Sequence, residues 1–79
     1  MLNNLKLARA NKEWSQAEMA EMLEISRQSV HAIETGKYDP SLPLAMRIAR
    51  LFGRRVEDIF KDVATERELE LKRQYAQAK

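Results

Sequence analysis

The sequence predicts an all-α fold of short amphipathic helices. Apolar residues recur at the three- and four-residue spacing of a buried helix face. Serines stand just before three of these segments, where a hydroxyl can accept a hydrogen bond from a free amide of the first helical turn. The chain has 79 residues and no cysteine, so it forms one small domain whose core must hold without disulfides.

The first predicted helix precedes Trp14. Leu5 and Ala8, with Leu2 ahead of them, give this helix an apolar face. Trp14 stands just before a helix cap, which favours burial as a core anchor over exposure as a stacking platform for bases.

The second predicted helix begins at Gln16. Ser15, followed three residues later by Glu18, forms a capping box in which each side chain satisfies a backbone amide near the other residue. The apolar residues that follow lie on one stripe, which we expect to be buried: Met19, Ala20 and Leu23.

A third helix must begin soon after, because Ser26 is a second capping residue only three positions beyond Leu23. We expect Ile25 to pack back over this helix and its inner face to carry Val30 and Ile33. The outer face near its start then carries Arg27, Gln28, His31 and Ala32. Two short helices with this spacing indicate a DNA reader.

Scaffold residues follow in the second half of the chain. Gly36 and Pro40 mark a loop, Ser41 is a helix cap, and Pro43 is tolerated in the first turn after it. Gly53 is placed to end this helix. The apolar residues expected to complete the core are Leu44, Ala45, Ile48, Ala49, Phe52, Val56, Ile59 and Phe60.

Several segments occur in an ordered series: Arg9 followed by W-S-Q at residues 14–16, then A-E-M-L-E-I-S-R-Q-S-V, I-E-T-G-K-Y-D-P-S-L and L-F-G-R-R-V-E-D-I-F. Together they resemble the Cro/phage-repressor-type, or XRE-like, family of helix-turn-helix transcriptional regulators, from about residue 4 to residue 60. The resemblance implies a compact five-helix, lambda-repressor-like DNA-binding domain over residues 1–62. Residues 63–79 would be a C-terminal extension.

The resemblance also implies a role for each matched residue. The implied base contacts are Arg27, Gln28, His31 and Ala32. The implied contacts to the DNA backbone are Gln16, Ser26, Thr35, Lys37 and Tyr38. Arg9 and Glu34 would form a structural ion pair, and the dimer contact would include Arg54, Arg55 and Val56.

Side-chain chemistry supports the base-reading positions. Arginine can donate two parallel hydrogen bonds to guanine, and glutamine can pair with adenine in a similar way, each worth roughly 1–3 kcal/mol of discrimination. The alternative is that Arg27 and Gln28 lie on a solvated helix face. His31 is open between a base contact and an ordinary surface position, because histidine titrates near neutral pH.

Three residues depart from the family pattern. Glu13 and Glu24 stand where many members have glycine, which indicates either local strain or a turn that avoids positive φ. Arg55 stands where serine is common and supplies no hydroxyl cap, so we expect the fifth helix to be short and frayed.

Composition excludes several classes. One histidine and no cysteine exclude a conventional zinc site, and we expect neither a metal nor a cofactor. No apolar run approaches the ~20 residues of a membrane span, and no signal peptide is evident, so we expect no membrane partner and a cytoplasmic, nucleoid-associated protein. The net charge is only +2, and charges are acidic from residue 13 to 24 and largely basic afterwards, which allows an acidic back and a basic front or a mixed surface.

The final stretch must be interpreted from its pattern alone. Thr65 and Glu68 repeat the capping-box spacing, so a helix can begin at about Glu66. Such a helix is marginal in water without a packing partner. A dimer arm, a segment that binds a partner protein and a frayed end all remain open.

The sequence therefore predicts a sequence-specific DNA-binding transcriptional regulator, a repressor or autoregulator. Since one recognition helix covers few base pairs, we expect a homodimer on a pseudo-palindromic stretch of double-stranded DNA. The alternative is an antitoxin or other protein-interaction module, with the C-terminal tail contacting the partner. We expect no enzyme, because the chain has one histidine, no nucleophile elbow and little room for a deep pocket.

Overall fold

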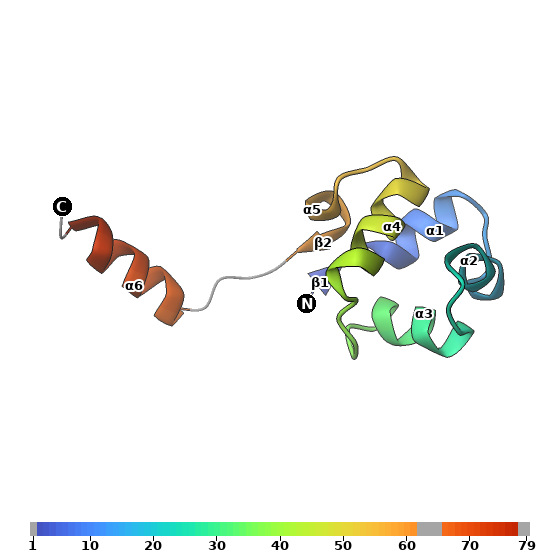
Figure 1. Ribbon diagram of the computed structural model, residues 1–79, viewed down its shortest axis with the longest axis horizontal. Coiled ribbons are helices and arrows are strands. Elements are labelled where there is room, and N and C mark those ends of the chain that lie inside the picture. The colour runs from blue at the N-terminus through green and yellow to red at the C-terminus, as the bar shows by residue number, and fades with distance from the viewer. Residues whose placement is uncertain (1, 62–65, 78–79) are drawn as a thin grey trace.

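The computed structural model describes residues 2–61 and 66–77. Its elements are β1 (Leu2–Asn3), α1 (Leu5–Asn11), α2 (Gln16–Leu23), α3 (Arg27–Glu34), α4 (Leu42–Phe52), α5 (Val56–Ile59), β2 (Phe60–Lys61) and α6 (Glu66–Gln77). The helices α1 to α5 pack into one unit, residues 2–61, which we call the body, and α6 stands apart from it (Figure 1). The predicted all-α fold is confirmed, with one short strand pair in addition.

The core of the body is apolar and comes from all five helices. Among the residues that the structure describes, every residue that is buried as a whole, backbone and side chain together, is apolar. The buried residues are Leu5, Ala8, Met19, Ala20, Leu23, Val30, Ile33, Ala45, Ile48, Ala49, Phe52, Ile59 and Phe60. All were expected in the core, and Ile25, Leu44 and Val56 are partly buried against it.

Trp14 is partly buried against this core, as expected. Its ring lies 5.5 Å from that of Phe52, centroid to centroid, with the two planes tilted by 42°. Such a tilted pair is a favourable aromatic arrangement. Trp14 therefore fixes the link between α1 and α2 against α4.

Serine residues start α2, α3 and α4 at the predicted positions. The Ser15 Oγ accepts from the Glu18 amide at 3.0 Å, and the Glu18 carboxylate accepts from the Ser15 amide at 3.0 Å, which completes the capping box. Ser26 accepts from the amide of the third helical residue of α3, and Ser41 does the same in α4. Local sequence thus determines where these helices begin.

Two glutamates occupy left-handed backbone conformations. Glu13 has φ of 59° and Glu24 has φ of 58°, so neither turn avoids positive φ. A non-glycine residue in this region costs roughly 1–2 kcal/mol. The body therefore keeps the turn geometry for which glycine would be favoured and places strained glutamates in it.

The N-terminus pairs with the end of the body through a two-stranded antiparallel sheet. Leu2 is opposite Lys61, and Asn3 is opposite Phe60. The prediction that Leu2 belongs to the apolar face of the first helix is wrong, because Leu2 lies in β1 and is 65% exposed. The Asn3 Nδ2 donates to the Ile33 carbonyl at 2.8 Å, which ties β1 to the last turn of α3.

The fifth helix is short, as expected from Arg55. It spans four residues, and no Arg55 side-chain bond caps it. Instead the Asp58 carboxylate accepts from the Arg55 amide at 3.3 Å and from the Arg55 guanidinium at 3.2 Å. This hydrogen bond from the Arg55 side chain lowers the pKa of Asp58.

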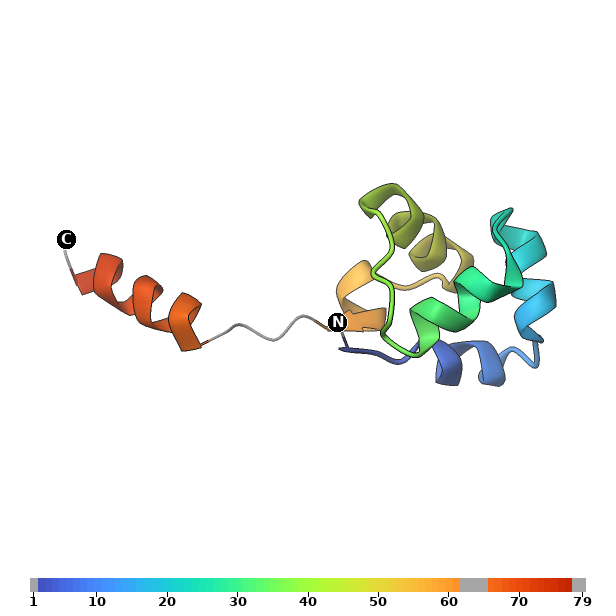
Figure 2. The ribbon, with the colours of Figure 1, turned by 90° about the horizontal axis from the view of Figure 1, so that it is seen from below.

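The helix α6 begins at Glu66, where the pattern predicted a start. Thr65, its predicted cap, lies outside the described residues. None of residues 66–76 is buried, and both views show α6 away from the body (Figures 1 and 2). Among the described helices, none is both long and apolar enough to cross a membrane.

Candidate nucleic-acid interface

The helices α2 and α3 form the predicted pair. Three residues separate them, and the two helices make direct contact. The helix α3 lies along one edge of the body, at the bottom of Figure 1 and at the front of Figure 2. A partner larger than the body can therefore reach the outer side of α3 along its whole length.

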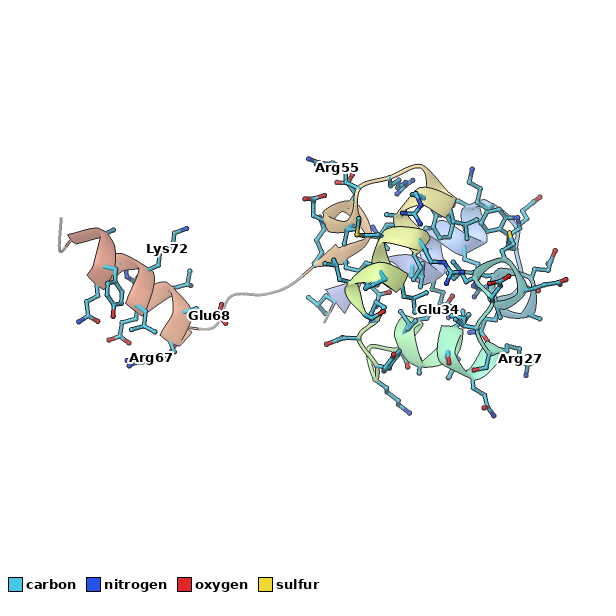
Figure 3. The ribbon with its side chains drawn as sticks, viewed as in Figure 1. Arg27, Glu34, Arg55, Arg67, Glu68 and Lys72 are labelled. Carbon is cyan, nitrogen blue, oxygen red and sulfur yellow. The ribbon has the colours of Figure 1, made fainter. Side chains whose placement is uncertain are left out.

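The first turns of α3 expose the predicted base-reading residues. Arg27, Gln28 and His31 are exposed, and Ala32 is half-buried. Arg27 points outward from the corner of the body (Figure 3). Arg27, Gln28 and His31 line an open hollow of about 370 Å³ together with Gln16, the first residue of α2. The fold thus brings side chains from two helices to one surface.

The hydroxyl of Ser26 is engaged within the protein. Its Oγ accepts from the Ser29 amide at 3.0 Å and lies 2.8 Å from the Ser29 Oγ. Capping α3 is therefore the role that the structure gives this side chain. A contact of Ser26 with a DNA backbone would have to share the same oxygen.

The remaining backbone-contact candidates lie at the other end of α3. The Thr35 Oγ1 donates to the His31 carbonyl at 3.0 Å and to the Ala32 carbonyl at 3.2 Å, so it closes the helix. The amides of Lys37 and Tyr38 both donate to the Ala32 carbonyl, while their side chains are exposed. The loop after α3 therefore has an ordered backbone with a cationic and a phenolic side chain facing solvent.

An ion pair lies behind the surface that Gln16 and His31 share. The Arg9 Nε donates to the Glu34 Oε2 at 2.6 Å, and the Arg9 Nη1 donates to the Trp14 carbonyl at 2.7 Å. The Glu34 side chain is only 2% exposed, and that of Arg9 is 14% exposed. The structure thus brings together the two residues that the resemblance paired, and they join α1 to the end of α3.

Glu34 is held in its charged form. Burial by itself raises the pKa of Glu34, but the hydrogen bonds from Arg9 and Gln16 and the charges of Arg9 and Lys6 outweigh burial and lower it. The hydrogen bond to Glu34 in turn raises the pKa of Arg9. Both partners therefore stay ionised near neutral pH.

Gln16 makes two contacts that its sequence pattern does not predict. Its Nε2 donates to the Glu34 Oε1 at 3.0 Å and lies 3.3 Å from the His31 Nδ1. Gln16 thus links the buried ion pair to a base-reading candidate. No local signal could have shown this, because 15 and 18 residues separate Gln16 from its two partners.

Arg47 also has a structural role that its sequence pattern does not predict. Its Nη2 donates to the Leu23 carbonyl at 2.6 Å. The last carbonyls of a helix lack partners within the helix, so this bond satisfies the end of α2 beside the turn. Arg47 therefore supports the helix pair from α4.

The dimer candidates lie in the connection from α4 to α5 and at the start of α5. Arg54 and Arg55 are exposed, Val56 is half-buried, and all three line a shallow depression of about 510 Å³ with Met46 and Arg50 among the other lining residues. Arg27 and Arg55 are at opposite corners of the body (Figure 3). Arg27 and Arg55 therefore lie on separate parts of the surface of the body.

The fold and the exposed side of α3 define a small helix-turn-helix protein. A profile of the helix-turn-helix family matches residues 5–59. The chain therefore belongs to the helix-turn-helix family.

The chain is similar to proteins named as HTH-type transcriptional regulators. The chain is 53% identical over 60 residues to an uncharacterized HTH-type transcriptional regulator of Methanocaldococcus jannaschii. The aligned residues make up 76% of this chain and 91% of that protein. It is 43% identical over 60 residues to the uncharacterized HTH-type transcriptional regulator YgzD of Bacillus subtilis, with the same coverage of 76% and 91%. The crystal structure of the hypothetical transcription factor NHTF from Neisseria has a TM-score of 0.64 and 31% identity, over 70% of this chain and 62% of that chain.

Proposed function

We propose that this protein is a sequence-specific, DNA-binding transcriptional regulator that places the first turns of α3 in the major groove. The observation that carries the proposal is the exposed group formed by Arg27, Gln28 and His31 beside the start of α2. In helix-turn-helix proteins, the start of the second helix contacts base edges. The names of the relatives, HTH-type transcriptional regulators, support the same non-enzymatic role.

Contacts to phosphates would position α3. The backbone N–H of Gln16 is at the start of a helix, where it lacks an acceptor within the helix and can donate to a phosphate. Lys37 and Tyr38 would contact the same backbone from the other end of α3, with Thr35 and Ser26 as further candidates. Such contacts position the protein and carry no sequence information directly.

The active species would be a homodimer on a pseudo-palindromic operator. A second recognition helix about one turn of DNA away, ~34–36 Å, supplies the specificity that one helix lacks. The depression lined by Arg54, Arg55 and Val56 is the proposed contact, and residues of α4 also line it. Occupancy of such a site would repress transcription or regulate the protein's own gene, in the cytoplasm.

The second candidate function is that of an antitoxin or protein-interaction module. It is favoured by α6, which stands apart from the body and exposes Leu69 at 45% and Tyr75 at 71%. In this alternative the DNA-binding domain spans residues 1–62 and the extension, residues 63–79, contacts a partner protein. The two functions are compatible within one chain.

The deciding experiment is a selection of bound genomic fragments by the full chain at about 150 mM salt. We expect recovery of a short inverted repeat. The double variant Arg27→Ala, Gln28→Ala should lose this enrichment, whereas Arg67→Ala, Gln74→Ala, which removes the same side-chain types from α6, should retain it. No enrichment by a folded protein would overturn the proposal and direct attention to a protein partner of α6.

Single substitutions distinguish base contacts from phosphate contacts. Gln28→Ala should cost roughly 1–3 kcal/mol and relax the preference at one base pair. Lys37→Ala should weaken all sequences alike and reduce the salt slope by about one unit. Equal, sequence-independent losses in both variants would contradict the assigned roles.

A further inference from the structure

A continuous series of polar contacts runs from the core side of the body to the proposed DNA-binding surface. It passes from Arg9 to Glu34 at 2.6 Å, from Glu34 to Gln16 at 3.0 Å, and from Gln16 to His31 at 3.3 Å. Arg9 and Glu34 are largely buried, Gln16 is half-buried and His31 is exposed. The buried Arg9–Glu34 pair therefore limits which hydrogen-bonding roles Gln16 and His31 can take.

The ionised Glu34 determines how the Gln16 amide is oriented. A carboxylate can only accept hydrogen bonds, and Glu34 is kept ionised by Arg9. The Gln16 atom that faces Glu34 must then be the donor, Nε2, and the Gln16 Oε1 must be the other end of the amide. The usual ambiguity between the two ends of a glutamine amide does not arise here.

The Gln16 amide in turn selects the tautomer of His31. The Gln16 Nε2 carries only hydrogens, so the His31 Nδ1 that lies 3.3 Å from it must accept. In a neutral imidazole one nitrogen accepts and the other carries the hydrogen. The hydrogen of His31 therefore resides on Nε2.

We propose that Gln16 is a positioning residue that makes His31 a hydrogen-bond donor toward base edges. His31 would then read an acceptor in the major groove, namely N7 or O6 of guanine, N7 of adenine or O4 of thymine, and would not read the amino groups of adenine or cytosine. This inference rests on the proposed function, because it specifies what the same surface recognises.

In this arrangement the side chain of Gln16 has no hydrogen left to donate to a phosphate. Both amide hydrogens are directed at partners within the protein, so the side chain has only the acceptor Oε1 left for outside groups. A phosphate also only accepts. Any phosphate contact by Gln16 would therefore come from its backbone amide at the start of α2.

The first test reads the tautomer directly in the free protein. The chain has a single histidine, so a long-range proton–nitrogen NMR spectrum at about pH 8.5 contains one pair of ring nitrogens. We expect hydrogen on Nε2 and an accepting Nδ1. Gln16→Leu should raise the fraction of the other tautomer about fivefold, as expected for the loss of one hydrogen bond.

The NMR test has a matched control variant and two results that would contradict the inference. Gln28→Leu removes another glutamine from the same hollow and should leave the tautomer ratio unchanged. Hydrogen on Nδ1 in the wild type, or equal ratios in wild type and Gln16→Leu, would overturn the inference. Circular dichroism of each variant verifies that the fold is retained.

The second test uses the selected operator with single acceptors removed. One position at a time, purines are replaced by 7-deazapurines, guanines also by an analogue that lacks O6, and thymines by an analogue that lacks O4. At one position we expect about 2- to 10-fold weaker binding by the wild type and no change for His31→Ala. Removing an amino group of adenine or cytosine should change the binding of the wild type and of His31→Ala to the same extent.

The outcomes separate this inference from the proposed function. If an operator is recovered but no acceptor removal distinguishes wild type from His31→Ala, the donor role of His31 is wrong and the proposed function stands. If His31→Ala responds differently only to loss of an amino group, His31 accepts and the inference is overturned. If no operator is recovered, both fail.

Discussion

The body and α6 are both helical, but they differ in what supports their helices. The body, residues 2–61, buries residues from every one of its helices, whereas none of residues 66–76 is buried. Both α2 and α6 begin where a capping-box pattern predicts a start. Capping and spacing thus suffice to specify where a helix begins, but packing of an apolar face supplies most of a helix's stability.

One ion pair from each region shows the same difference. Arg9 and Glu34 in the body approach to 2.6 Å with side chains that are 14% and 2% exposed. Arg67 and Glu70 in α6 lie 3.9 Å apart with side chains that are 72% and 64% exposed. Since solvent screens exposed pairs, of these two pairs only Arg9–Glu34 should contribute measurably to folding.

The largest expected effect comes from the core. Ile48→Ala removes a side chain that is 0% exposed and should lower the free energy of unfolding by about 2–5 kcal/mol. Urea unfolding followed by fluorescence reports on the body alone, because the only tryptophan is Trp14 and it packs against Phe52. Leu69→Ala in α6 should not move the midpoint. A matching loss in Leu69→Ala would show that α6 unfolds together with the body.

The next effect compares the two ion pairs. Arg9→Ala should lower the free energy of unfolding by about 3 kcal/mol, because it leaves a buried carboxylate without its principal donor. The matched variant Arg67→Ala should melt like the wild type. Thermal melts followed by Trp14 fluorescence measure both. An unchanged melting temperature for Arg9→Ala would remove this pair from the account of stability.

Acid should affect the body through Glu34. Its pKa in the folded state lies below the ordinary value of 4.5, so its contribution is complete above that pH and is lost as the pH falls through the lowered pKa. Glu34→Gln should be less stable at neutral pH and should lose less stability on acidification. Unfolding midpoints between about pH 7 and pH 3 measure this.

Other carboxylates of the body also contribute to the loss of stability in acid, so the acid experiment needs a control variant. Glu18 and Asp58, whose pKa values are also lowered, leave part of the acid loss in every variant. Glu70→Gln in α6 serves as the control and should reproduce the wild-type curve for the body. Parallel curves for wild type and Glu34→Gln would show that Glu34 contributes nothing to the acid response.

The smallest expected effect tests the backbone that packing imposes on the body. Glu24→Gly should raise the free energy of unfolding by about 0.5–1 kcal/mol, because glycine relieves the positive φ at a lower entropic cost. Glu21→Gly, three residues earlier inside α2, should lower it by about 1 kcal/mol. The same substitution should thus have opposite signs at two neighbouring exposed positions. Destabilisation by both would mean that Glu24 is not strained.

Much of the candidate site could be predicted from the sequence. The cap at Ser26 and the inward spacing of Val30 and Ile33 leave Arg27 and Gln28 outside, and the structure places them there. Their contacts with DNA remain predictions. The link from Gln16 to Glu34 and His31 could not be predicted, because it depends on how α2 and α3 pack and not on any local signal.

By itself, the sequence determined where α2, α3 and α4 begin and which faces they bury, because caps and periodicity act within a few residues of the chain. Only the tertiary structure decided that Leu2 would pair with Lys61, that Glu24 would accept positive φ and that Gln16 would connect Glu34 to His31. These features join residues distant in the chain or impose a locally unfavourable backbone. They are stable because burial of the shared core outweighs their local cost.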